Sequence, residues 1–213
     1  MKYIDFLNKF KDSGIIDLSN IRTIFPDFNS RRLYEWQKSG KIKKVSNGYY
    51  IFADKKLLEN DVNLIANKLY EPSYLSLEYA LNYYSLIPEA VFVKTSISPK
   101  KTTKRETAVG NFSYRSVKEN LFFGYTLKGE ENSRFKIAEP EKALLDFLYL
   151  RADIKNLADI ESLRINKERY REIINEEKLN TYLKQFDSKT LNKKIEILKD
   201  YILNFKEYIE QKL

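Results

Sequence analysis

The dipeptide Asn47-Gly48 is the feature of this sequence that most narrows what the chain can form. It separates two short segments, 41–45 and 49–52, in which polar and apolar side chains alternate. Asn-Gly favours the tight turn of a β-hairpin because both residues tolerate the positive φ that the turn requires. The sequence therefore predicts an antiparallel hairpin at 41–52, which leaves residues 1–40 to form the rest of a small unit.

Residues 1–40 show three helical patterns. Tyr3, Phe6, Leu7 and Phe10 fall on one face of a first helix, and a short second helix opens at Leu18-Ser19. A third helix runs to about Ser39. Three helices followed by a hairpin are typical of a winged helix-turn-helix, which we predict for residues 1–56. The residues expected to cap or end these helices are Ser13-Gly14, Ser19, Pro26, Asn29 or Ser30, and Gly40.

The third helix has two different faces. Leu33 and Trp36 point one way, whereas a polar set at helical spacing points the other way. A helix that packs through a narrow apolar face and exposes a basic, hydrogen-bonding one suits contact with base edges in a DNA groove. The polar set is Arg31, Tyr34, Glu35 and Lys38. In the hairpin, Ile42 and Val45 are expected to help close the core of this unit.

The positive charge of the chain is concentrated in this helix and the strand after it. The formal net charge is +8, and residues 29–44 carry six basic side chains against a single acidic one, Glu35. Such a clustered basic stripe is typical of a surface that binds a polyanion. The alternative is a three-helix domain that contacts proteins and merely exposes its basic helix to solvent. We favour double-stranded DNA, bound through Ser30, Arg31, Arg32, Tyr34, Lys38, Lys41, Lys43 and Lys44.

The absence of histidine and cysteine excludes most catalytic and metal-binding chemistry. Disulfides, thiol nucleophiles, thiolate zinc sites and histidine bases or ligands are all ruled out. The sequence thus indicates no catalytic residues, no metal and no cofactor. The charged start at Lys2, Asp5 and Lys9 is unlike a signal peptide, and no apolar run approaches the ~20 residues of a membrane span. We expect a soluble cytoplasmic protein that is not an enzyme and does not bind a membrane.

Residues 57–213 are expected to form a second, larger domain that begins just after Lys56. Helical and strand-like patterns follow one another there, with glycines between the strands. The predicted helices cover 62–69, 76–84 (capped by Ser76), 140–150 (with Pro140 first), 167–175, 176–186 and 188–212. The predicted strands cover 90–97, 111–117, 121–127 and 133–137. The fold class we predict is α+β, a winged helix-turn-helix followed by a mixed α/β domain that ends in long helices.

Five blocks of sequence follow one another in this second domain. They are Pro72-Ser73-Tyr74-Leu75-Ser76-Leu77-Glu78-Tyr79-Ala80-Leu81, Leu86-Ile87-Pro88-Glu89, Gly110-Asn111-Phe112-Ser113-Tyr114-Arg115, Phe122-Phe123-Gly124-Tyr125 and Ala138-Glu139-Pro140-Glu141-Lys142-Ala143-Leu144-Leu145-Asp146. In this order they resemble the AbiEi family, the antitoxins of type IV toxin–antitoxin (abortive infection) systems. The hairpin from Gly40-Lys41-Ile42 to Gly48-Tyr49-Tyr50 is similar to that family too, so the resemblance covers about residues 30–150. Ser85 departs from it, because the family has glycine before Leu-Ile-Pro-Glu.

The resemblance implies a bacterial antitoxin in phage defence whose winged helix represses its own promoter. It also implies that the second domain counteracts a co-encoded nucleotidyltransferase toxin. A type IV system does not require direct contact between antitoxin and toxin. The residues alone leave another function open, a stand-alone winged-helix transcriptional regulator whose second domain senses a ligand or a protein.

The polar residues of the blocks form a candidate site in the second domain. These residues are Ser76, Glu78, Arg115, Glu141, Lys142 and Asp146. An acid–base or phosphate-handling cluster is one interpretation. The one we favour is a helix start that suits the helix dipole, followed by an exposed ion pair between Lys142 and Asp146 worth only ~0.3–0.5 kcal/mol. Gly124 and Gly129 have the spacing of a phosphate loop, yet Glu130-Glu131 replace the lysine and hydroxyl that such a loop needs.

The last predicted helix carries an apolar seam in steps of four and three. This seam is expected either to pack on its own domain, which we favour, or to form a dimer or partner contact. Its residues are Leu191, Ile195, Leu198, Ile202, Phe205 and Ile209.

Overall fold

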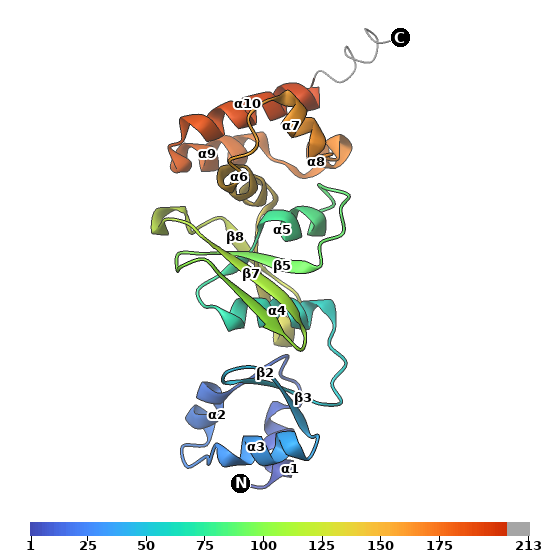
Figure 1. Cartoon of the computed structure of the whole chain (residues 1–213), viewed down its shortest axis with the longest axis vertical. Helices are drawn as coiled ribbons and strands as arrows, with labels where there is room; N and C mark the ends of the chain where they lie inside the picture. The colour runs from blue at the N-terminus through green and yellow to red at the C-terminus, as the bar shows by residue number, and fades with distance from the viewer. Residues whose placement is uncertain (204–213) are drawn as a thin grey trace.

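The computed structural model of the chain describes residues 1–203 and has a mixed α+β fold, as predicted (Figure 1). The first unit contains three helices and a small sheet with the strand order β1-β3-β2. Its elements are α1 (Tyr3–Phe10), β1 (Ile16–Asp17), α2 (Leu18–Ile24), α3 (Arg31–Lys38), β2 (Ile42–Ser46) and β3 (Tyr49–Phe52).

The local signals of the first unit act as the sequence indicates, with two exceptions. In the hairpin turn Gly48 takes a positive φ but Asn47 does not. Ser46 pairs with Tyr49, so the β2–β3 hairpin turns at Asn47-Gly48, and Gly48 has a φ of +81°. The Asn29 side chain accepts a hydrogen bond of 2.9 Å from the backbone N–H of Arg31 at the start of α3. The expected cap of α2 is wrong. Asp17, and not Ser19, caps this helix, because its carboxylate accepts a 2.8 Å hydrogen bond from the backbone N–H of Ser19.

The helices of the first unit enclose a small aromatic core on one face of the sheet. Phe6 and Phe10 of α1 pack there with Leu33 and Trp36 of α3, so the inward face of the third helix is confirmed. The other buried members are Ile16, Ile21, Phe28, Ile42 and Phe52.

The other face of this small sheet packs on the second unit. Val45 and Ile51 are buried, and they belong to the larger hydrophobic cluster of the chain. The expectation that Val45 closes the first core is therefore wrong. Ile42 and Val45 are an odd number of residues apart on one strand, so alternation places them on opposite faces. Lys55 strengthens this junction, because its Nζ donates to the carbonyl of Ser13 and pairs with Asp61 at 3.3 Å.

The second unit is built on a mixed sheet with the strand order β6-β7-β5-β4-β9-β8. The β4–β9 and β5–β7 pairs are parallel, and the other neighbours are antiparallel. The strands are β4 (Tyr74–Leu75), β5 (Val93–Ser98), β6 (Thr103–Thr107), β7 (Gly110–Ser116), β8 (Tyr125–Lys128) and β9 (Phe135–Ala138). Two short 3-10 turns, η1 (Glu119–Leu121) and η2 (Glu131–Ser133), precede β8 and β9.

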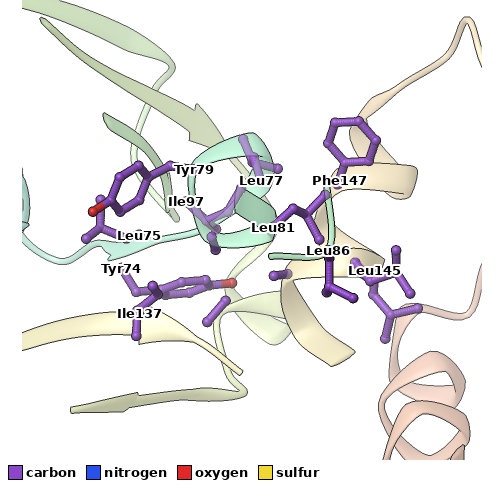
Figure 2. Packing of buried hydrophobic residues seen from close by; sticks show 14 of the residues in the cluster. Tyr74, Leu75, Leu77, Tyr79, Leu81, Leu86, Ile97, Ile137, Leu145 and Phe147 are labelled. Atoms are coloured by element: carbon purple, nitrogen blue, oxygen red, sulfur yellow. The ribbon is translucent and has the colours of Figure 1, made fainter. Parts of the chain in front are cut away.

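Helices cover both faces of this sheet (Figure 1). One face packs on α4 (Glu59–Leu69), where the Tyr114 hydroxyl donates to the carbonyl of Ala66. The other face meets α5 (Leu77–Tyr83) and α6 (Pro140–Leu150), and Figure 2 shows Leu81 of α5 between Ile97 of β5 and Phe147 of α6. The remaining helices pack beyond α6: α7 (Leu157–Ser162), α8 (Lys167–Ile173), α9 (Glu176–Phe186) and α10 (Lys189–Leu203).

The sequence predicts the long elements of the second unit better than the short ones. The helix that starts at Pro140 is confirmed, whereas most of the predicted strand 121–127 is not a strand, because a 3-10 turn occupies its start. Strand β6 was not predicted, since Thr-Lys-Arg-Glu-Thr contains no apolar residue to mark it. No helix among residues 1–203 is both long and apolar enough to cross a membrane.

The apolar seam of the last helix packs within the chain. Leu191, Ile195, Leu198 and Ile202 are all buried in the core of the second unit, as the favoured interpretation expects. The remaining two residues of the predicted seam, Phe205 and Ile209, lie outside the described residues.

Ser85 has a backbone φ of +59°, which explains why glycine suits this position. A side chain in the left-handed region costs about 1 kcal/mol because its Cβ crowds the neighbouring carbonyl. We expect Ser85→Gly to stabilise the full chain by about 0.5–1 kcal/mol, measured as a higher urea midpoint. The control is Ser116→Gly at the exposed end of β7, which should lower the midpoint because glycine weakens a strand. Equal effects of the two variants would contradict this account.

Candidate functional site

Helix α3 presents an open basic face at the free end of the molecule. Figure 1 shows α1 and α3 at this end, with the small sheet between them and the second unit. Arg31, Arg32 and Lys38 are exposed, and Tyr34 is 68% exposed. Tyr34 thus offers both its ring and its hydroxyl group to solvent. The polar face expected of the third helix is therefore outward and unobstructed.

Aromatic packing holds α3 in this position. The Trp36 ring lies 4.6 Å from the Phe6 ring and 5.4 Å from the Tyr3 ring, centre to centre. Both of these rings come from α1. Edge and tilted contacts at these distances are favourable geometries for aromatic pairs. A two-turn helix without such an anchor would be marginal in water, so the packing of Trp36 is what presents the basic face.

The predicted DNA-binding residues differ in whether their side chains already interact with other residues of the chain. Ser30 accepts a hydrogen bond of 3.1 Å from Arg22, and Arg31 pairs with Glu35 at 3.7 Å. Lys41 places its Nζ 4.5 Å from the centre of the Tyr3 ring. Within residues 1–203, the side chains of Arg32, Tyr34, Lys38, Lys43 and Lys44 make no hydrogen bond or ion pair.

Lys43 and Lys44 of the hairpin lie on opposite faces of the small sheet. Lys43 pairs across the sheet with Ile51, whose side chain is buried toward the second unit, and Lys44 pairs with Tyr50. Cross-strand partners share a face, so neighbouring lysines point to opposite sides. Both are exposed, because β2 is an edge strand. A single nucleic-acid surface would contact one of them more closely than the other.

The second candidate site contains a buried ion pair. Lys142 and Asp146 of α6 are paired, and both side chains are 0% exposed. Asp146 also accepts hydrogen bonds from Tyr74 at 2.9 Å and from Ser76 at 2.8 Å. Lys142 in turn donates to the Tyr74 hydroxyl at 2.8 Å. We call these four residues the α6–β4 cluster, because they join helix α6 to the strand β4 and the residue after it.

Burial dominates the electrostatics of the α6–β4 cluster. It raises the pKa of the Asp146 carboxyl and lowers the pKa of the Lys142 ammonium, while their mutual contact opposes both shifts. The Phe123 and Phe186 rings lie 4.9 and 5.0 Å from Nζ, so Lys142 is surrounded by aromatic faces. Gly124 leaves the room that this lysine needs, because a Cβ there would lie 3.0 Å from Cγ of Lys142.

The expectation of an exposed ion pair at Lys142 and Asp146 is wrong. Helix α6 is enclosed by the sheet on one side and by the C-terminal helices on the other, so nearly all of its faces are buried. Ser76 occupies the N-cap position of α5, as expected, but its hydroxyl donates to Asp146 and makes no capping hydrogen bond to the helix. Because the whole cluster is shielded from solvent, no substrate has access to it in this structure.

Glu141 is buried beside the cluster but points another way. Its Oε1 accepts a hydrogen bond of 2.8 Å from the backbone N–H of Asn175, which precedes α9. Its Oε2 is buried and has no partner among the residues that the structure describes. This carboxylate therefore attaches the C-terminal helices to α6 rather than joining Lys142 and Asp146.

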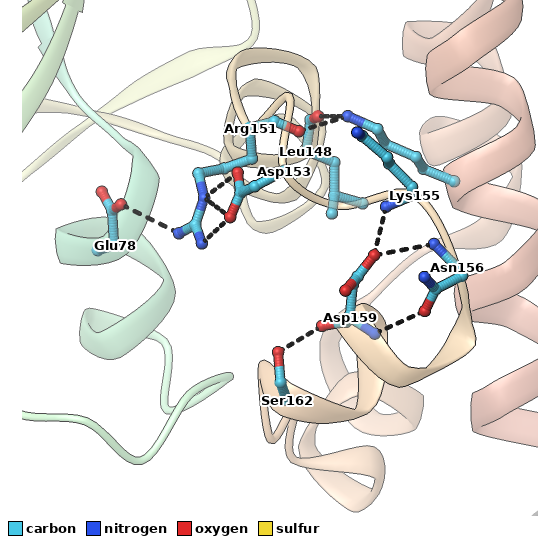
Figure 3. A network of polar contacts seen from close by, with 9 residues as sticks. Glu78, Leu148, Arg151, Asp153, Lys155, Asn156, Asp159 and Ser162 are labelled. Carbon is cyan, nitrogen blue, oxygen red and sulfur yellow. Dashed lines mark hydrogen bonds and ion pairs between the residues drawn. The ribbon is translucent and has the colours of Figure 1, made fainter.

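Glu78 and Arg115 lie apart from the α6–β4 cluster, on an open groove of about 850 Å³. Glu78 forms part of its wall and faces Arg151, which also pairs with Asp153 at 2.7 Å (Figure 3). Arg115 rises from β7. The six polar residues of the sequence blocks thus divide between a buried cluster with its neighbour Glu141 and a surface groove.

Three residues that contribute to these sites or support them were not predicted from the sequence. Tyr74 lies two residues before Ser76 on the same face of an extended segment, a spacing that would have indicated it. Arg151 and Lys194 carry no local signal, because they meet only in the folded chain. Lys194 of α10 donates to the carbonyls of Leu148 and Arg151 at 2.8 and 2.6 Å and so caps the end of α6.

No protein-family model matches this chain, and no curated protein matches it either.

We expect Asp146→Ala to destabilise the full chain by about 3–5 kcal/mol, because it leaves the Lys142 ammonium buried without its counter-ion. The matched control is Glu35→Ala, which removes the acid of another i,i+4 pair, Arg31–Glu35, that is exposed. This control should cost about 0.5 kcal/mol or less. Urea unfolding followed by circular dichroism measures both.

A double variant tests the physical reason for this loss. Lys142→Met combined with Asp146→Leu removes both charges, so it should recover much of the stability lost in Asp146→Ala. If Asp146→Ala unfolded at the same urea concentration as Glu35→Ala, the cluster would not have the role described above.

Proposed function

We propose that residues 1–56 form a winged helix-turn-helix that binds double-stranded DNA, with α3 as the recognition helix. The observation that carries this proposal is the outward face of α3. Arg31, Tyr34 and Lys38 project from a helix that Trp36 anchors, and nothing else among the described residues covers them. Side chains of these types reach base edges and phosphates when such a helix enters a major groove.

The order of the elements and the charge support the same function. Helix α2 leads to α3 through a short connection, 25–30, and the β2–β3 hairpin follows directly, as in winged helix-turn-helix units. Residues 29–44 carry six basic side chains and one acidic one. Phosphate neutralisation by such a cluster supplies most of the affinity of a DNA-binding surface.

The attachment of the second unit leaves this surface accessible. The second unit packs on the face of the small sheet that carries Val45 and Ile51, and α3 lies beyond the opposite face (Figure 1). A duplex can therefore approach α3 from the free end of the molecule. The wing would contribute through its exposed edge, β2, since one of its faces is covered.

We further propose that the chain is a transcriptional autorepressor and an antitoxin of the AbiEi type, acting against a co-encoded nucleotidyltransferase toxin. The support is the order of the five sequence blocks, which form β4 with α5, β7 and α6 and meet in the core of the second unit. Tyr74 and Ser76 of the first block bond there to Lys142 and Asp146 of the last block, so these two widely separated blocks share a structural role. We propose a cytoplasmic site of action.

A stand-alone transcriptional regulator that senses a ligand is the second candidate. The groove of about 850 Å³ favours it, because this volume suits a small molecule. A nucleotidyltransferase gene beside the gene for this chain would favour the antitoxin.

We expect binding to the chain's own promoter DNA to weaken steeply with salt. If four to six of the basic residues in 29–44 neutralise phosphates, the slope of log K against log salt is about −4 to −5. Lys38→Ala should reduce the steepness by about one if this lysine contacts a phosphate. The control is Lys128→Ala, an exposed lysine of β8, which should change nothing. Fluorescence anisotropy at several salt concentrations measures the slope, and a slope near zero would refute DNA binding.

Reversing charge on α3 should separate repression from antitoxin activity. We expect full-length Arg31→Glu/Lys38→Glu to lose promoter repression, because two contacts become repulsive, and still to rescue cells that express the toxin. A promoter reporter and growth under toxin induction, read in one strain, give the two results. Loss of rescue in this variant, with an unchanged urea midpoint, would mean that neutralisation runs through DNA binding.

A further inference from the structure

The open groove of the second unit has a polar floor made by two strands. On β7, Phe112 and Tyr114 are buried on the side that packs on α4, so Asn111, Ser113 and Arg115 alternate onto the other side. Strand β6 adds Lys104 and Glu106, which pair across the sheet with Ser113 and Asn111. Helix α5 packs over β5 and leaves this part of the sheet open.

The polar side chains of this floor are uncommitted. In the part of the chain that the structure describes, the side chains of Asn111, Ser113, Lys104, Glu106 and Arg115 have no hydrogen bond or ion pair. Polar groups that converge on one hollow without protein partners are what a ligand site needs to orient its ligand. Most exposed polar side chains lie on convex surfaces, whereas these five share a concave one.

The floor of the groove carries more positive than negative charge, because Lys104 and Arg115 stand there against one carboxylate, that of Glu106. On the wall, Glu89 faces Arg164 at 3.7 Å, and Glu78 lies 3.9 Å from Arg151, which pairs more closely with Asp153 at 2.7 Å. Arg105, also of β6, pairs with Phe112 and belongs to the α4 side. The floor thus favours an anion, and a guanidinium with an ammonium nearby suits phosphate oxygens.

An aromatic ring stands at the rim of the same groove. Phe92 lies just before β5 and is 89% exposed. The apolar wall below it includes Leu77, which is held at a φ of +59°. A non-glycine residue in this conformation is strained, and such strain gathers at ligand sites. A bare phenyl ring at the rim of a groove whose floor carries cationic side chains offers a stacking surface for a flat base, with phosphate contacts further along the groove.

We propose that this groove binds a nucleoside phosphate, with the base against Phe92 and the phosphates at Arg115 and Lys104. Asn111 and Ser113 would hydrogen-bond the sugar or the base edge. The ligand we infer is a free mononucleotide, because a volume of about 850 Å³ lies within the range of small-molecule clefts. The site shares no residue with the DNA-binding face of α3, so it stands or falls independently of that function.

Isothermal titration of the full-length protein with ATP, GTP, CTP and UTP tests the site. We expect at least one of them to bind, Arg115→Ala to weaken that binding at least tenfold, and Phe92→Ala at least fivefold. Both side chains are exposed and unbonded, so neither variant should change the urea midpoint. Arg134→Ala, an exposed arginine outside the groove, is the matched control and should change binding less than twofold. Arg31→Glu/Lys38→Glu should also bind normally, which separates this site from α3.

Three further probes define the class of ligand. The matching nucleoside and inorganic tripolyphosphate should each bind at least tenfold more weakly than the nucleotide, since each lacks one half of the contacts. A ten-nucleotide single strand should bind no tighter than the mononucleotide. The proposal is overturned if no nucleotide binds at millimolar concentration or if Arg115→Ala and Arg134→Ala bind alike. The proposal is also overturned if tripolyphosphate binds as well as the nucleotide. It is overturned too if the ten-nucleotide single strand binds more tightly than the mononucleotide and Arg115→Ala abolishes that binding.

Discussion

The buried pair between Lys142 and Asp146 is the interaction on which the second unit depends. It places two charges where water cannot reach them, so their desolvation is offset only when every donor and acceptor is matched. Tyr74 and Ser76 supply those matches from β4 and the residue after it. The pair therefore specifies where α6 sits on the sheet. Because the C-terminal helices pack on the outer side of α6, they are positioned through the same contact.

The small sheet of the first unit serves both halves of the molecule. One face, with Ile42 and Phe52, closes the aromatic core that holds α3, and the other, with Val45 and Ile51, packs on the second unit. A change in the packing of either core therefore acts on the same small sheet. Physical coupling between α3 and the second unit has a short path, through the β2–β3 hairpin (42–52) that turns at Asn47-Gly48.

The candidate sites were predictable from the sequence to different degrees. The basic face of α3 was visible because helix periodicity and charge are local properties, and Trp36 signals its own burial. The blocks of the second unit directed attention to Ser76, Lys142 and Asp146, yet suggested an exposed pair. The burial of Lys142 and Asp146 depends on which elements pack against α6, and no local pattern in residues 57–213 indicates those contacts. The groove was not predicted at all, since Phe92, Lys104 and Arg115 come from separate segments and share a surface only through the register of β5, β6 and β7.

The sequence by itself determined the elements that short-range forces decide. The turn at Asn47-Gly48, the start of α6 at Pro140 and the two faces of α3 follow from backbone φ preferences and side-chain spacing over a few residues. Only the tertiary structure decided that Val45 faces the second unit, that Lys142 is enclosed and that Arg115 stands free in a groove. These outcomes depend on which faces meet across long stretches of chain. Burial, and with it the strength of every charge, is a property of that packing and not of the neighbouring residues.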